Sequence, residues 1–204
     1  LSSLEDEKKW VPDVDALVSE NISRTYIAES QMPEIKTHPD YINEDTRSEF
    51  IEKNKLKILR KYQVNAIKAV QKSAQNGNKR FLLEMATGTG KTLTCAAIIK
   101  LFLKTGNAQR ILFLVDRIEL ENQAKKSFRQ SIGKDYVVKV WKEDRDNWKT
   151  ADIVISTVQS LLASSRYRDF SPNDFNLIIS DEAHRSIGGN ARAVFEYFTG
   201  DKIG

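Results

Sequence analysis

The stretch "LLEMATGTGKT" at residues 82–92 decides the fold, because it links an apolar run to a glycine-rich turn and then to a helical pattern. The run "RFLLEMA" (80–86) is short and apolar, which is typical of a buried strand. "KTLTCAAIIKLFLKTG" (91–106) then carries apolar residues at helical spacing and ends in a glycine. A buried strand that turns directly into a helix is the repeating unit of a parallel sheet with helices on its faces.

The same alternation continues along the chain. Continuous β-branched runs between helices favour strands that are buried on both faces, which indicates an α/β fold with a doubly wound parallel sheet. In such a sheet, ligands bind at the carboxyl ends of the strands. Further helices are predicted over 62–77, 118–133, 157–164 and 190–198, and further strands over 110–115, 136–141, 152–156 and 175–180.

Length and composition narrow the class of protein. A chain of 204 residues suits one domain, or one domain with an arm. Its single cysteine cannot form an internal disulfide, which suits a reducing compartment. No apolar run approaches the roughly 20 residues of a membrane helix, and no basic-then-apolar leader opens the sequence. Because the first residue is Leu1 and not Met, we expect a piece of a longer chain.

Charge divides the chain into two parts. Residues 1–50 hold 5 Lys and Arg against 12 Asp and Glu, whereas residues 51–204 hold 27 against 16. We interpret 1–56 as an acidic N-terminal arm or connector and 57–204 as the α/β domain. The basic surplus of the domain has two interpretations: an ordinary solvated surface, or a surface that meets a polyanion.

The glycine-rich turn has the composition of a phosphate-binding loop. Backbone N–H groups of Gly88, Thr89, Gly90 and Lys91 can surround a phosphate, and the start of the following helix adds a positive dipole end. Lys91 supplies a charge for the β and γ phosphates, and the hydroxyl of Thr92 suits one Mg²⁺ position. The alternative is a glycine-rich turn with an incidental lysine.

A second element, "LIISDEAH" (177–184), is an apolar strand that ends in two carboxylates. Asp181 is suited to hold the water shell of Mg²⁺, and Glu182 is suited to orient and polarise an attacking water. We expect His184 to join the hydrogen bonds around the nucleotide. The alternative is a pair of solvated loop carboxylates.

A glutamine precedes the loop in "LRKYQVNAI" (59–67). The amide of Gln63 carries both a donor and an acceptor, so it can select adenine. The alternative is a surface glutamine on an amphipathic helix.

These segments follow one another in the order of superfamily 2 helicase motifs. Together they resemble the motor subunit of type I restriction enzymes, from about Leu59 to Gly204. The loop departs from the strict pattern at Met85, which stands in place of a glycine, and "ATGTGKT" is the superfamily 2 form. The segments are "LRKYQVNAI", "MATGTGKT", "ILFLVDR", "ISTVQSLL" and "IISDEAHRSIGG".

The resemblance implies a first RecA-like domain that binds ATP and Mg²⁺. By this resemblance Gln63 is the adenine reader, residues Thr87 to Thr92 are the phosphate loop, and Asp181 with Glu182 is the magnesium and water pair. Lys91, Asp181 and Glu182 are then the catalytic residues, and Thr92 and Asp181 serve the metal.

The resemblance also implies movement on duplex DNA. Arg117, Thr157 and Gln159 lie in segments that resemble strand-tracking motifs. For Arg117 the alternative is a structural ion pair. For Thr157 it is a helix N-cap, a role that is compatible with a phosphate contact.

In that family a nuclease precedes the motor and a second RecA-like domain, with an arginine finger, follows it. Modification and specificity subunits complete the complex in the cytoplasm of a bacterium or archaeon. This sequence stops at Gly204, before the family's Thr-Ala-Thr motif, and shows no nuclease carboxylate cluster, so we expect a RecA-like domain that is incomplete at its C-terminal end. Two other functions stay open: a repair or RNA-directed superfamily 2 helicase, and a nucleotide-switched binding module with little turnover.

Overall fold

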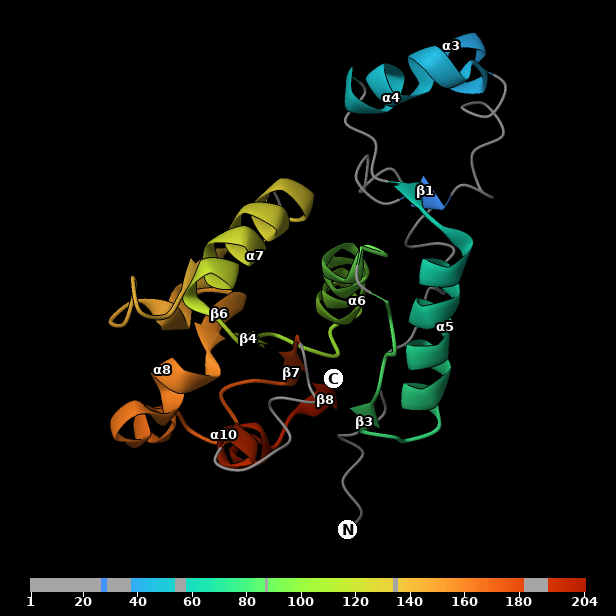
Figure 1. Ribbon diagram of the computed structural model, residues 1–204. Coiled ribbons are helices and arrows are strands. Elements are labelled where there is room, and N and C mark those ends of the chain that lie inside the picture. The colour runs from blue at the N-terminus through green and yellow to red at the C-terminus, as the bar shows by residue number, and fades with distance from the viewer. Residues whose placement is uncertain (1–26, 29–37, 54–57, 87, 134–135, 182–190) are drawn as a thin grey trace.

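A computed structural model describes residues 27–28, 38–53, 58–86, 88–133, 136–181 and 191–204 (Figure 1). Thr87, Glu182 and His184 lie outside the described residues.

The centre of the domain is a six-stranded sheet in which every pair of neighbouring strands is parallel. The strand order is β3-β8-β7-β4-β6-β5, so β4 lies in the middle. In the register, Phe113 of β4 lies between Ile155 of β6 and Ile179 of β7. The strands are β3 (Arg80–Phe81), β4 (Ile111–Val115), β5 (Val138–Val140), β6 (Ile153–Thr157), β7 (Leu177–Ser180) and β8 (Asp201–Ile203).

Helices cover both faces of this sheet, as the apolar runs predict. Figure 1 shows α5, α6 and α7 on one side and α8 and α10 on the other. Alternate residues of β4 follow this division, because Phe113 packs in the core beneath α5–α7 whereas Leu112 and Leu114 pack in the opposite core. The helices are α5 (Lys61–Gln75), α6 (Lys91–Lys104), α7 (Ile118–Ser131), α8 (Val158–Leu162) and α10 (Ala191–Tyr197), with 3-10 turns at Trp148–Thr150 and Ala163–Asp169.

The strand pair β3 and β8, at one side of the sheet, differs from the sequence expectation. The run 80–86 forms a strand only over Arg80–Phe81, although Leu83 N–H still donates to Gly204 O at 2.8 Å. Its partner β8 was not predicted, because Asp201 and Lys202 are charged and yet buried. The amine of Lys202 is satisfied by the carbonyl oxygen of Phe198 at 2.7 Å, and burial lowers its pKa.

Part of the acidic arm also has described structure. Strand β1 (Ile27–Ala28) pairs in parallel with β2 (Ile58–Leu59), which directly precedes α5. Two helices, α3 (Pro39–Ile42) and α4 (Glu44–Lys53), form a hairpin. Arg47 closes this hairpin by donating to the carbonyl oxygens of Tyr41 and Ile42, at 2.6 and 3.0 Å. The division at residue 56 stays a prediction.

Among the described residues, no helix has the length and apolar character needed to cross a membrane.

The core beneath α5–α7 supplies a stability prediction. Phe128 is fully buried and meets Phe113 edge to face, with ring centroids 4.8 Å apart. Phe128→Ala should lower the free energy of unfolding by about 3–5 kcal/mol, measured by urea denaturation. The neighbouring exposed residue supplies the control, since Arg129→Ala should change it by no more than about 0.5 kcal/mol. Equal effects of the two substitutions would contradict this packing.

Candidate functional site

The phosphate-loop candidate spans the turn between β3 and α6, at the carboxyl edge of the sheet. Gly88 and Gly90 have φ values of +79° and +81°, a region that favours glycine, and Gly90 is the N-cap of α6. One of the four expected N–H donors is engaged within the loop, because Thr89 N–H donates to Ala86 O at a long 3.4 Å. The Thr89 hydroxyl also donates to this oxygen, at 2.6 Å.

Lys91 and Thr92 form the first turn of α6, and both are half-buried. Asp181 directly follows β7, also half-buried, and its N–H donates to Leu114 O at 2.9 Å. The sheet therefore brings the end of β7 to the same edge as the loop.

Cys95, one turn along α6 from Lys91, links the two halves of this site. Although part of the Cys95 residue is exposed, its thiol is desolvated, which raises the thiol pKa to about 12. The charge of Asp181 raises this pKa further and that of Lys91 lowers it. Lys91 at the start of α6 and Asp181 at the end of β7 thus lie on the same side of the sheet as this thiol.

These residues fit a nucleotide phosphate chain with Mg²⁺. The positive φ values at Gly88 and Gly90 let the backbone curl into this turn, and α6 directs its positive dipole end at the loop. Hard oxygen donors for Mg²⁺ are present at Thr92 and Asp181. The geometry of Thr87 and Glu182 lies outside the described part of the chain.

Gln63 is not the surface glutamine of the alternative interpretation, because it is only 2% exposed. Its Oε1 accepts from Arg60 N–H at 2.8 Å, and its Nε2 donates to the carbonyl oxygens of Thr89 and Gly90, both at 3.3 Å. The amide thus ties the start of α5 to the loop, and the reading of adenine by Gln63 stays a prediction.

The three DNA-contact candidates lie at the ends of two neighbouring strands. Arg117 is the N-cap residue of α7; its side chain is 68% exposed and lies 3.6 Å from Asp116. Thr157, paired with Val115 across the sheet, is 1% exposed and caps α8 by accepting from Ser160 N–H at 3.1 Å. Gln159 is exposed in α8. The ion pair and the cap are therefore both present, and DNA contact stays a prediction.

Sequence reasoning missed a buried carboxylate beside these candidates. Glu121 of α7 is fully buried, and its Oε1 accepts from Thr157 N–H at 2.9 Å. Lys142 Nζ lies 2.6 Å from Oε2, in contact as an ion pair but without hydrogen-bond geometry. The signal was present, since Glu121 shares a helical face with Ala124 and Phe128.

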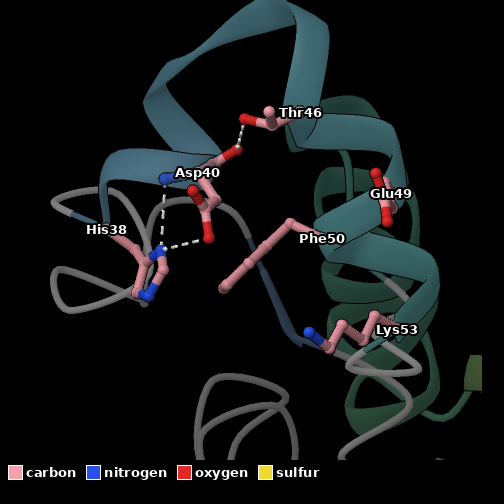
Figure 2. Close-up of a pocket in the computed structure, with 6 residues that line it drawn as sticks. All are labelled: His38, Asp40, Thr46, Glu49, Phe50 and Lys53. Atoms are coloured by element: carbon pink, nitrogen blue, oxygen red, sulfur yellow. Dashed lines mark hydrogen bonds and ion pairs between the residues drawn. The ribbon is translucent and has the colours of Figure 1, made fainter.

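A separate pocket of about 430 Å³ lies in the arm, between α3 and α4 (Figure 2). Asp40 N–H donates to His38 Nδ1 at 3.2 Å across its rim. All of its lining residues belong to the arm hairpin, so this pocket is distinct from the phosphate-loop site. They are His38, Asp40, Thr46, Glu49, Phe50 and Lys53.

Comparison with known proteins assigns a family. Residues 56–203 match the family described as "Type III restriction enzyme, res subunit". The chain belongs to this family. The match covers the whole domain that carries the loop and Asp181, which confirms the resemblance to restriction-enzyme subunits seen in the sequence.

The relatives of this chain include subunits of restriction enzymes and proteins named as helicases. The EcoAI endonuclease subunit of a type I restriction enzyme from Escherichia coli is 35% identical over 150 residues, which cover 70% of this chain and 18% of that protein. The IRC3 protein of Saccharomyces cerevisiae, named for ATP-dependent helicase activity, is 33% identical over 147 residues, covering 69% of this chain and 21% of that protein. The chain therefore spans about a fifth of the length of these relatives.

Solved structures confirm the α/β fold as RecA-like. The SWI2/SNF2 ATPase core of Sulfolobus solfataricus, solved with dsDNA, aligns with a TM-score of 0.61 at 19% identity, covering 71% of this chain and 31% of that chain, which is a likeness of fold. A fragment assigned as an HsdR subunit of a type I restriction enzyme from Vibrio vulnificus YJ016 aligns with a TM-score of 0.50 at 31% identity, covering 70% and 25%. The chain is thus a helicase-like domain related to restriction-enzyme subunits.

The buried ion pair gives a prediction about stability. Lys142→Met leaves the Glu121 charge buried and unpaired, so it should lower the free energy of unfolding by about 3–5 kcal/mol. Glu121→Gln should cost less, because a neutral amide still accepts from Thr157 N–H and Lys142, whose side chain is 29% exposed, can be hydrated.

Urea denaturation of both single variants and of the double variant measures these changes in the free energy of unfolding. The double variant should recover most of the loss caused by Lys142→Met alone. A Lys142→Met variant as stable as the parent would contradict a charged, buried Glu121.

Proposed function

We propose that this chain is the ATP-binding half of an ATP-dependent DNA translocase of a type I restriction enzyme, which couples ATP hydrolysis to movement on duplex DNA. The observation that carries the proposal is the carboxyl edge of the sheet, where the turn with positive φ at Gly88 and Gly90 leads into Lys91 and where Asp181 follows β7. A phosphate-binding charge and a metal-holding carboxylate at one sheet edge are what phosphoryl transfer from a nucleotide requires.

The roles follow from the chemistry of each group. ATP with Mg²⁺ supplies the terminal phosphoryl group that is transferred to water. Lys91 and the loop from Thr87 to Thr92 bind the phosphates, and Thr92 with Asp181 holds the metal. Glu182 orients and polarises the water, while Gln63 selects adenine.

The DNA partner is supported by position and charge. Residues 51–204 carry 27 basic against 16 acidic residues, and Arg117 is an exposed cation at the same sheet edge as the loop. Arg117, Thr157 and Gln159 are proposed as phosphate contacts of one strand. The EcoAI relative is by its name an endonuclease subunit of a type I restriction enzyme, which supports the restriction assignment.

A repair or RNA-directed superfamily 2 helicase is the second candidate, favoured by the 33% identity to IRC3. A nucleotide-switched binding module is the third, and Glu182 argues against it because a pure switch needs no residue that polarises water. A duplex-stimulated ATPase that does not separate strands would favour translocation over helicase activity.

The rest of the complex belongs to the same proposal. A second RecA-like domain of the full-length protein supplies the arginine finger, a nuclease adjoins the arm of residues 1–56, and modification and specificity subunits complete the assembly. Residues 1–204 alone should then be nearly inactive, because an arginine finger contributes roughly 10³–10⁵ in rate.

Two substitutions in the full-length protein separate ATP binding from ATP hydrolysis. Glu182→Gln should keep ATP binding and lower the ATPase rate by about 10²-fold or more, since it removes the charge that polarises water. Lys91→Ala should abolish detectable ATP binding by calorimetry without unfolding the domain, whereas Lys126→Ala, on the exposed surface of α7, should leave binding unchanged. Near-normal turnover by Glu182→Gln would point to a different base.

The salt dependence of DNA binding tests the role of Arg117. Arg117→Ala should make the slope of log K against log[salt] shallower by about 1, measured by fluorescence anisotropy on duplex DNA. Arg129→Ala is the matched control, because it removes the same charge from the opposite end of α7. Equal slopes for Arg117→Ala and the parent would remove Arg117 from the DNA surface.

A further inference from the structure

The first turn of α5 contacts the backbone of the candidate phosphate loop at Thr89 and Gly90. The hydroxyl of Tyr62 donates to Thr89 O at 2.7 Å, and Gln63 Nε2 reaches both Thr89 O and Gly90 O at 3.3 Å. The approach is tight, because a Cβ added to Gly90 would lie 2.7 Å from Gln63 Nε2. Thr89 O is therefore held toward α5, whereas Gly90 O is shared between Gln63 and Thr94 N–H of α6, the latter at 3.0 Å.

A peptide plane is rigid and trans, so the direction of a carbonyl fixes the direction of the next N–H. Holding Thr89 O toward α5 turns the N–H of Gly90 away from α5. Gly90 O is held by Gln63 together with Thr94 of α6, and this fixes the direction of the Lys91 N–H. These two N–H groups belong to the set that a phosphate-binding loop presents to an anion.

We propose that Tyr62 is a positioning residue of the nucleotide site, whose hydroxyl fixes the Thr89–Gly90 peptide so that the loop is preformed for the phosphates of a nucleoside di- or triphosphate. This inference rests on the proposed ATP-binding function. It adds a residue that the sequence motifs did not single out.

The hydroxyl, and not the ring, carries this role. Tyr62 is 41% exposed, so burial of its ring is a weak reason for an aromatic residue at this position. Its bond to Thr89 O is also shorter than either bond from Gln63. Gln63 shares the task, so loss of the Tyr62 hydroxyl weakens the loop's preformed shape without abolishing it.

Tyr62→Phe in the full-length protein tests the inference, because it removes only the oxygen. Binding of MgATP, MgADP and MgGTP is measured by calorimetry together with thermal unfolding. The dissociation constants should rise about three- to tenfold, the worth of one hydrogen bond, and by the same factor for adenine and guanine nucleotides. Equal factors are expected because the hydroxyl acts on the loop and not on the base.

Tyr197→Phe is the matched control. Tyr197 also donates its hydroxyl to a backbone carbonyl at 2.7 Å, that of Phe170, in the core on the α8 and α10 side of the sheet. This variant should lower the melting temperature and leave nucleotide affinity unchanged. An equal loss of affinity in Tyr197→Phe would overturn the inference, since general destabilisation would then explain both variants.

Two further outcomes overturn the inference. Unchanged affinity of Tyr62→Phe would show that the hydroxyl does not position the loop. A loss for MgATP and MgADP without a loss for MgGTP would make Tyr62 a reader of the base. The parent protein and Lys91→Ala separate this failure from failure of the proposed function. If the parent binds no nucleotide, the proposed function and the role of Tyr62 are both wrong. If the parent binds nucleotide and Lys91→Ala does not, the proposed function stands and the result for Tyr62→Phe decides only the role of Tyr62.

Discussion

Parallel pairing is the constraint on which the rest of the domain depends. All six strands run the same way, so their carboxyl ends meet at one edge, and each connection must cross a face of the sheet. The crossing helices α6 and α7 begin at that edge with Gly90 and Arg117 as their N-caps. The candidate phosphate loop, Asp181 and the exposed Arg117 are therefore brought to one edge, although Gly90 and Asp181 are far apart in sequence.

The sheet also links the nucleotide site to the proposed DNA surface through β4. Asp181 N–H donates to Leu114 O, and the next residue of β4, Val115, is the register partner of Thr157. Glu121 then holds the Thr157 N–H from α7. The end of β7 and the start of α8 are therefore joined through the backbone of β4 and β6, with the Glu121 side chain holding the Thr157 end.

Sequence patterns predicted the elements that burial alone determines. Strand β4 is fully buried along its length, and its apolar run is unambiguous. The pattern failed where a polar group is buried with a partner that lies far away in sequence or is not visible as a motif. Strand β8 carries Lys202, whose amine is satisfied by backbone carbonyls, and Glu121 accepts from Thr157 N–H and forms an ion pair with Lys142. Single-residue polarity cannot reveal such partners, because they depend on how the folded chain turns and packs around each polar group.

In the candidate site, too, the sequence predicts the chemistry of the residues but not the contacts that their side chains make. Spacing and residue type predicted the loop and Asp181 as a site, because a phosphate site needs glycine for backbone freedom and lysine and carboxylate for charge. They did not identify the use of Gln63 and Tyr62 as ties to the loop carbonyls, since a side chain's partner depends on how closely α5 approaches α6. If Gln63 reads adenine, its Nε2 must either leave the loop carbonyls or contact base and loop together. The Tyr62 hydroxyl is then the tie to Thr89 O that need not be released when a base is bound.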